Sequence, residues 1–273
     1  MPTTALIFTW RLWSKGGLHI NERVGEIREN NKGTPMKIIA FRNSEDIDVQ
    51  FLDEFYYIKE HQTYSNFKMG TIRNPYDKTV LGTGYLGVGR HKIQYPDTMT
   101  NTKTYMSWKN MIDRCYCENH KERNPAYFEI STVCKEWHNF QTFADWYEEH
   151  EYETDGRLHL DKDIKYAGNT VYSPQTCILV PQRINMMFMN KSNDKGLPNG
   201  VRKVRNKFGA KYNDEDLGLY STVEDAYKAY TDKKKEAIIE LANQYKSIMP
   251  SDVYEIIVGY EFDIRNDKNY RVA

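Results

Sequence analysis

The chain lacks long apolar runs, and its charge has no excess of either sign. No segment approaches the roughly 20 consecutive apolar residues of a membrane-spanning helix, so we expect no membrane partner and a cytoplasmic location. Residues 1–17 contain a short apolar stretch without a small-residue cleavage site, which indicates an edge strand or a leader rather than a signal peptide. Lys and Arg together number 38, as do Asp and Glu, so any nucleic-acid surface must be a local basic patch.

Cysteine is also scarce. The four cysteines, Cys115, Cys117, Cys134 and Cys177, do not form the paired C-x-x-C knuckles of common zinc sites. We therefore expect reduced and mostly buried thiols, and no structural zinc. A zinc site made by Cys115, Cys117, Cys134 and a histidine is the alternative that the spacing leaves open.

The patterns that are present predict a multidomain α+β protein. Residues 36–95 alternate or run apolar with few helix formers, which predicts a small β domain. From about residue 104, aromatic and apolar residues fall three or four apart, which predicts two helices that form a platform. The predicted segments are a leader at 1–32, the β domain at 33–98, a platform with a finger at 99–192, a DNA-binding module at 193–246 and an extension at 247–273.

The finger is the stretch LDKDIKYAGNTVYSPQTCILVPQRIN, residues 160–185. Its pattern predicts a strand, a long turn, a second strand and a helix whose first turn contains Pro181. Such a ββα unit can hold a divalent cation between a strand carboxylate and a helix amide, and the cation can stabilise charge during phosphodiester hydrolysis. Asp161 or Asp163 and Asn185 are the candidate metal ligands.

The hydrolysis also needs a general base beside the metal, and several residues are candidates. Asp163 is a weak acceptor, and His159 shares a strand face with Asp161. Lys162 can act as a base only if burial lowers its pKa by several units, and Asn169 is expected to orient the turn. The alternative is structural: Asp161 and Asp163 cap the hairpin, Lys162 pairs with one of them, and His159 packs on the strand.

The densest basic segment follows the finger, between Lys191 and Lys211. Gly200 precedes a strand VRKVR, Asn206 and Lys207 form a turn, and FGAKY returns, so we predict a basic β-ribbon suited to phosphate contact and the major groove. Ser221 and Glu224 form an S-x-x-E capping box for a supporting helix. A merely solvated charged hairpin is the alternative.

The phrase GVRKVRNKFGAKY, with LGLYSTVEDAYKAY after it, resembles the plant ethylene-response (APETALA-type) DNA-binding domain. The order of the blocks FRNSEDIDVQF, NFKMGTIRNPY, VCKEWHNFQTFADW, LDKDI and YSPQTCILVPQRIN resembles phage-encoded HNH-type homing endonucleases that carry this C-terminal module. This resemblance implies a ββα-metal finger, a three-stranded sheet plus helix, a double-stranded DNA partner, a divalent metal such as Mg²⁺ and a bacterial host cell. The likeness to the ethylene-response domain implies DNA contacts at Arg202, Lys203, Arg205, Lys207 and Lys211. Lys162 stands where the endonuclease family has its working histidine.

Two functions follow from these observations. The first is a metal-dependent hydrolase that nicks or cuts double-stranded DNA, with Asp161 and Asn185 as metal ligands. The second is a catalytically degenerate phage factor, a regulator or anti-defence protein, which binds DNA or a host or phage protein without cutting.

Overall fold

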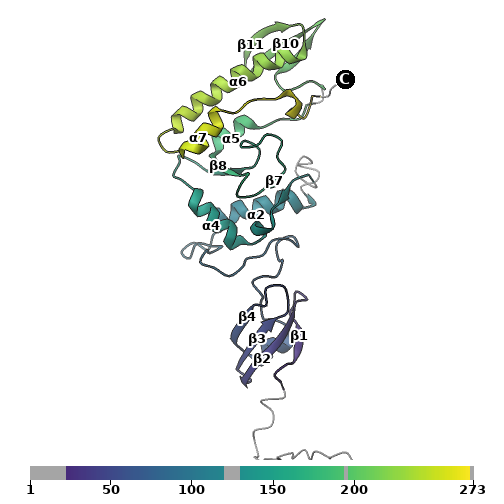
Figure 1. The fold of residues 1–273 in the computed structure, drawn as a ribbon, viewed down its shortest axis with the longest axis vertical. Helices are drawn as coiled ribbons and strands as arrows, with labels where there is room; N and C mark the ends of the chain where they lie inside the picture. Colours follow the sequence, from purple (N-terminus) through teal and green to yellow (C-terminus); the bar gives the residue numbers. More distant parts are fainter. Residues whose placement is uncertain (1–22, 120–129, 194–195, 271–273) are drawn as a thin grey trace, which may run out of the picture. The chain divides into compact units, whose positions relative to one another are not determined.

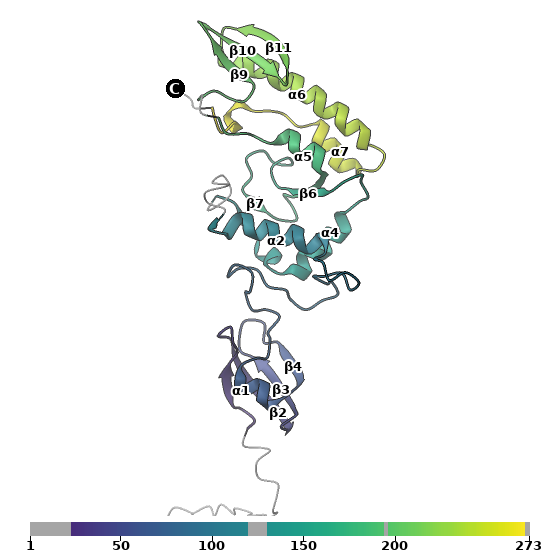
Figure 2. The same ribbon diagram turned by 180° about the vertical axis from the view of Figure 1, so that it is seen from behind.

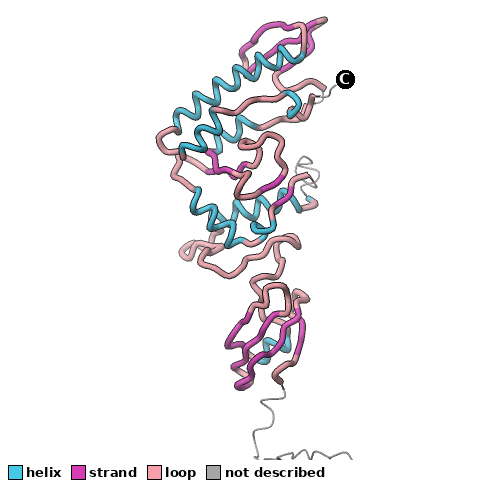
Figure 3. Tube along the Cα trace, in the orientation of Figure 1, coloured by secondary structure: helices cyan, strands magenta, loops and turns pink. Residues whose placement is uncertain are grey.

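The protein has an α+β fold, as predicted, and the computed structural model describes residues 23–119, 130–193 and 196–270. The chain forms two compact units, one made of Met1–Asp77 and Tyr85–Val88 and the other of Lys78–Gly84 and Gly89–Ala273. Strands dominate the described part of the first unit, and helices are prominent in the second (Figure 3). The predicted boundary after residue 98 therefore differs from the observed division, and the expected leader strand at 1–17 lies outside the described residues.

The first unit is an antiparallel sheet in the order β1-β2-β3-β4 with one short helix. Its elements are β1 (Ile27–Glu29), β2 (Pro35–Asn43), β3 (Asp46–Phe51), β4 (Ile58–Gln62) and α1 (Tyr64–Met69). Alternating side chains of β2 and β3, Met36, Ile38, Ile47 and Val49, are fully buried, and Phe67 of α1 closes this core. Strand β1 lies inside the predicted leader at 1–32. The sequence pattern did not predict this strand, because β1 contains a single apolar residue, which is exposed, and so shows no alternation.

The second unit begins with the helical platform. Its elements are α2 (Lys103–Tyr116), the 3₁₀ turn η1 (Lys135–His138) and α4 (Phe140–His150). Trp108, Trp137, Phe140 and Phe143 are all fully buried, and the Trp108 indole Nε1–H donates to the carbonyl oxygen of Trp137 at 2.7 Å. The predicted aromatic stripe is therefore core, although Trp137 lies in the 3₁₀ turn rather than in the second helix.

A hairpin and a helix follow the platform. Strand β6 (Leu158–Asp161) pairs antiparallel with β8 (Ile178–Pro181), while β7 (Val171–Tyr172) pairs parallel with β5 (Thr132–Val133). Pro181 is the N-cap of α5 (Gln182–Phe188), one residue before the position that we predicted for it. Residues 158–188 thus form a β-hairpin followed by a helix.

The C-terminal part contains a three-stranded antiparallel sheet in the order β11-β10-β9. Its elements are β9 (Val201–Val204), β10 (Lys207–Tyr212), β11 (Glu215–Tyr220), α6 (Val223–Tyr245), α7 (Ser251–Val258) and η2 (Ile264–Asn266). Two local predictions were wrong. The hairpin turns at Arg205 and Asn206, because Val204 pairs with Lys207. The N-cap of α6 is Thr222, whose hydroxyl accepts from the Asp225 N–H at 3.1 Å.

Helix α6 belongs to two cores. Ala226 and Tyr227 in its first turns pack with Val201 and Ala210 of the sheet. Ile238, Ala242 and Tyr245 further along pack with Ile164, Ile178, Val180 and Ile184 of the hairpin and α5. Figures 1 and 2 show the helix extending from the sheet to the neighbourhood of α5 and α7. At 23 residues it is about 35 Å long, so one rigid element connects the sheet to the finger.

The segment between α5 and β9 is held by the end of the chain. Asp267, only 5% exposed, accepts from the backbone and side-chain N–H groups of Asn199 with Oδ2 and from those of Asn269 with Oδ1. Asn269 in turn donates to the Lys191 carbonyl oxygen at 2.8 Å. The described part of the extension predicted at 247–273, residues 247–270, therefore packs on the finger and on the segment that leads to the sheet.

Among the described residues, no helix combines the length and the apolar character needed to cross a membrane.

Candidate functional site

The predicted site residues lie on the hairpin and on α5. In the β6–β8 register, His159 pairs with Val180 and Asp161 with Ile178. Leu160 between them is 6% exposed and points into the core, so His159 and Asp161 lie on the opposite face of β6. Asn185 lies on α5, which follows β8 directly.

Asp161 both closes the hairpin and faces a cavity. Its Oδ1 accepts from the backbone N–H groups of Asp163 and Ile164, each at 2.7 Å. Burial raises the pKa of the Asp161 carboxyl, and the Ile164 N–H opposes this shift. Within the described parts of the chain, no donor bonds to the other oxygen, Oδ2. Asp161 is thus a partly buried carboxylate with one structural oxygen and one oxygen available for a ligand.

Lys162 is a structural clamp. Its side chain is 7% exposed, and Nζ donates to the Asp163 carboxylate at 2.5 Å and to the Asn169 carbonyl oxygen at 2.8 Å. The Asn169 side-chain amide donates to the carbonyl oxygens of Lys162 and Val171, each at 2.8 Å, and its Oδ1 accepts from the Val171 N–H. The Lys162 amine thus donates to two acceptors of the hairpin turn. Lys162 and Asn169 together hold this turn closed.

His159 and Asn185 contact each other across the hairpin and helix. Asn185 Nδ2 lies 3.2 Å from His159 Nδ1, so the amide donates and the ring accepts when His159 is neutral. Burial lowers the pKa of His159, and the positive charges of Arg114 and Arg157 lower it further. The neutral ring thus fixes the amide so that Asn185 Oδ1 points away from it. With Nδ1 occupied, His159 acts as a positioning residue in this arrangement and not as the predicted base.

Acidification should weaken this arrangement. The lowered pKa means that His159 contributes stability above its unfolded value of about 6.5, and this contribution is lost as the pH falls through the folded pKa. We expect His159→Phe to show a smaller loss of thermal stability than the wild type between pH of about 7.5 and about 5. His138, whose pKa burial also lowers, contributes in the same direction in both proteins. Equal losses in the two proteins would contradict this role of His159.

The predicted site residues of the finger, apart from His159, line one cavity of about 360 Å³. The hairpin and α5 contribute Asp161, Asp163 and Asn185 to its lining, and α6 and the end of the chain contribute Lys234 and Phe262. Lys234 belongs to a run of three lysines, a pattern typical of a solvated face, but it is only 8% exposed. Ala226, Tyr230, Lys234, Ile238 and Ala242 lie four apart in the sequence, and this spacing was the signal that places Lys234 on the buried side of α6.

The basic residues of the C-terminal sheet differ in their partners. Arg202 is paired with Asp216 at 2.6 Å and Lys211 with Asp214 at 3.4 Å, whereas Lys203 Nζ lies 3.9 Å from the centre of the Phe208 ring. Arg205 and Lys207 are exposed at the β9–β10 turn, and no ion pair to either is found in the described segments. Among these five residues, Arg205 and Lys207 at the turn and Lys203 on β9 therefore have no acidic partner in the described segments, whereas acids around β11 neutralise Arg202 and Lys211.

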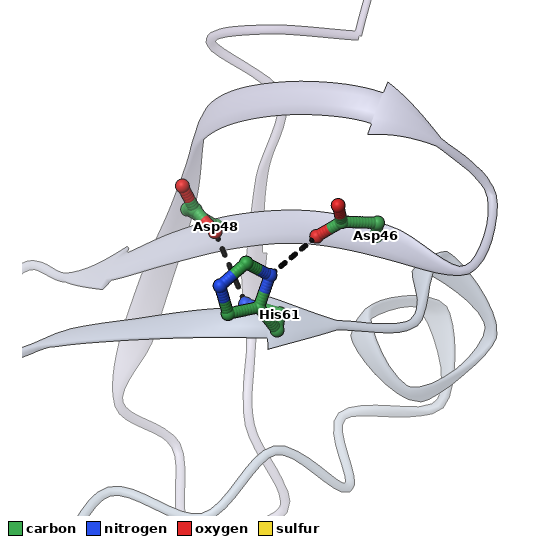
Figure 4. Close-up of side chains that lie close together, drawn as sticks. All are labelled: Asp46, Asp48 and His61. Carbon is green, nitrogen blue, oxygen red and sulfur yellow. Dashed lines mark hydrogen bonds and ion pairs between the residues drawn. The ribbon is translucent and has the colours of Figure 1, made fainter.

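In the described ranges, two other groups of side chains could hold a metal ion, and neither contains a predicted site residue. In the first unit, Asp46, Asp48 and His61 come together on β3 and β4 (Figure 4). Arg42 already donates to both carboxylates, to Asp48 Oδ2 at 2.6 Å, and this bond lowers the pKa of Asp48. The cluster is thus an ion-pair network that joins β4 to β3.

The second group is His91, Asp145 and Glu148. Its two acids are 61% and 50% exposed in their side chains, and both are paired with Arg90. His91 Nε2 lies 2.8 Å from Asp145 Oδ1. Here too, an arginine forms ion pairs with the carboxylates that a metal ion would need.

The cysteines are all free thiols. Burial raises the pKa of Cys115 and Cys134 to about 11 and that of Cys177 to about 12, which disfavours the thiolate that zinc requires. Among the described residues, neither metal-capable group includes a cysteine.

Comparisons with known proteins found no matching family model, no matching curated protein and no matching solved structure. The resemblance to HNH homing endonucleases and to ethylene-response domains therefore stays a prediction from the residues. The candidate site stands on its own geometry: a strand carboxylate and a helix amide on one cavity, attached through α6 to a sheet with a basic turn.

Proposed function

We propose that this protein is a metal-dependent endonuclease that nicks or cuts double-stranded DNA. One observation carries the proposal: Asp161 on β6 and Asn185 on α5 line the same cavity, and each has an oxygen that no described residue occupies. The resemblance to phage HNH homing endonucleases supports the same reaction and the same two ligands.

The donor set fits a hard divalent cation. Asp161 Oδ2 and Asn185 Oδ1 are oxygen donors, which Mg²⁺ prefers, and water or phosphate oxygens can complete the coordination. When bound, such an ion stabilises charge on the phosphate and lowers the pKa of a bound water. The raised pKa of Asp161 indicates that its carboxylate is unfavourable without a cation, so a bound ion would favour the charged form.

The other residues would either hold the metal ligands in place or accept a proton. His159 holds the Asn185 amide, and Lys162 and Asn169 hold the hairpin turn on which Asp161 lies. Asp163 lines the cavity, is 44% exposed in its side chain and has one carboxylate oxygen bonded to Lys162. Its other oxygen makes Asp163 the candidate acceptor for the water proton. A carboxylate is a weaker base than a histidine at neutral pH, so we expect slow turnover.

A second function is favoured by one specific observation. Lys162, at the position where the family has its histidine, donates to Asp163 and to the Asn169 carbonyl oxygen within the hairpin turn. A protein that kept the finger only as a scaffold would bind DNA, or a host or phage protein, without cutting. This alternative predicts DNA binding that Mg²⁺ and EDTA do not affect.

Supercoiled plasmid and phage genomic DNA, incubated with the protein and Mg²⁺, Mn²⁺ or EDTA, separate the two functions. The nuclease predicts nicked or linear DNA with either metal and none with EDTA. A gel shift that persists in EDTA, without cleavage under any condition, would favour the binding protein.

The sheet can be tested by binding alone. Arg205 has a φ of +53°, a conformation that glycine adopts readily, so Arg205→Gly removes charge without straining the turn. We expect Arg205→Gly combined with Lys207→Gln to weaken DNA binding and to reduce the salt slope of the affinity by about two.

The matched control is Arg202→Gln with Lys211→Gln, which removes the same charge from residues that have acidic partners. This control should reduce affinity less. Unchanged affinity of the Arg205 and Lys207 variant at two salt concentrations would exclude the turn as a DNA-binding surface.

A further inference from the structure

The cavity beside Asp161 contains a buried cation that the proposed mechanism does not use. Lys234 of α6 is 8% exposed and lines the cavity. No hydrogen bond or ion pair to its Nζ is found among the described residues. Its neighbours differ in this respect, because Lys233 is paired with Glu215 at 3.2 Å and Lys235 with Glu261.

The surroundings of Lys234 stabilise an ammonium group without bonding to it. Nζ lies 4.9 Å from the centre of the Phe262 ring and 5.7 Å from that of Tyr230, both within the range of cation–π attraction. The carboxylate of Asp267 contributes a favourable charge, but its oxygens already accept four N–H groups. Burial lowers the pKa of Lys234 and this charge opposes the shift. Its N–H groups thus remain available to an anion that enters the cavity.

The same cavity has a second unpaired polar group. The hydroxyl oxygen of Ser131, a residue 2% exposed, has no hydrogen-bond partner among the residues that the structure describes. Asp161 and Asn185 lie in the same lining, together with the aromatic rings of Tyr230 and Phe262. An anion held here would therefore lie in one cavity with the candidate metal ligands and with aromatic surface.

We infer that Lys234 forms a phosphate-binding subsite for a nucleotide in this cavity. Its ammonium donates to the phosphate oxygens, and Tyr230 and Phe262 give the nucleotide an apolar surface. A volume of about 360 Å³ lies at the lower end of the usual range for small-ligand pockets, about 300–1,000 Å³, and so suits one nucleotide unit. The inference deepens the proposed nuclease function, because it assigns a group that would hold the DNA phosphate opposite Asp161.

Calorimetric titration of the full chain in EDTA tests this subsite without metal or cleavage. The probe is thymidine 3′,5′-bisphosphate, with thymidine and inorganic phosphate as separate arms. We expect the bisphosphate to bind and thymidine not to bind; weaker binding of inorganic phosphate would show that the nucleoside contributes. Lys234→Met keeps an unbranched side chain against the two rings and removes the charge. It should weaken bisphosphate binding about tenfold or more.

Lys233→Met is the matched control and should leave the affinity within about twofold, because Lys233 lies outside the cavity lining. Protection of Lys234 can be measured in the wild type in case the variant does not fold. Acetic anhydride labelling, read by mass spectrometry, should decrease at Lys234 when the bisphosphate is present. Equal binding by wild type and Lys234→Met, or unprotected Lys234, would overturn the subsite whether or not the protein cleaves DNA. Inactivity on plasmid together with Lys234-dependent binding would contradict the nuclease and retain the subsite.

Discussion

Asp161→Asn should abolish metal-dependent DNA cleavage and leave the fold intact. The asparagine Oδ1 can still accept from the Asp163 and Ile164 N–H groups, so the hairpin turn keeps both hydrogen bonds. The substitution removes the charge that a divalent cation requires, and we expect a loss of about a thousandfold in cleavage rate. The measurement is the rate of plasmid nicking with Mg²⁺ and with Mn²⁺.

The thermal stability of Asp161→Asn without metal should not decrease with its cleavage rate. Because burial raises the pKa of Asp161, the metal-free protein loses stability as the pH rises and the carboxylate ionises. Asp161→Asn removes this cost, so its melting temperature in EDTA at neutral pH should equal or exceed that of the wild type. Asp161→Ala should lose cleavage and also stability, because alanine cannot accept the two N–H groups. Full cleavage by Asp161→Asn would show that the site lies elsewhere.

Ile238→Ala should destabilise the finger although Ile238 lies on the helix of the C-terminal sheet. The side chain is 1% exposed and packs in the core that contains Ile164, Val180 and Ile184. Removing three methyl or methylene carbons from such a site typically costs about 2–5 kcal/mol of unfolding free energy. Hydrogen exchange read by mass spectrometry should rise in peptides that cover 158–164 as well as in α6.

Ile239→Ala is the matched control, because Ile239 is only partly buried and lies outside that core. It should produce a smaller loss, confined to α6. If Ile238→Ala increased exchange in α6 alone, the finger and the sheet would be independent, and the rigid connection would be wrong. For the proposed nuclease, this connection predicts that cleavage occurs at a fixed distance from the sequence that the sheet binds.

The local patterns located the hairpin and the helix that follows it, because this order of elements is encoded by neighbouring residues. Asp161 and Asn185 lie on the strand and the helix that alternation and turn residues predict, and Pro181 lies one residue before its predicted position. The roles within the finger were harder to predict. Two contacts depend on atomic positions that residue spacing does not specify. One is the hydrogen bond from Lys162 Nζ to Asn169, and the other is the contact between Asn185 and Nδ1 of His159.

Long-range packing accounts for the other differences. The four-residue spacing of Lys234 with Ile238 indicates one helix face, but the cavity that this face lines involves Phe262 and Asp161 from distant segments. Likewise, the pairing of Arg202 with Asp216 depends on strand register. This pairing neutralises Arg202, whereas Arg205 and Lys207 keep their positive charge without an acidic partner in the described segments. A domain division from composition could not reveal that α6 belongs to two cores.

Whether Asp161 and Asn185 hold a divalent cation can be tested most directly by locating Mn²⁺ in crystals of the full chain from its anomalous scattering. We expect a peak between Asp161 and Asn185 in the wild type and no peak there in Asp161→Asn. A peak at Asp46, Asp48 and His61 or at His91, Asp145 and Glu148, with none at Asp161, would contradict it.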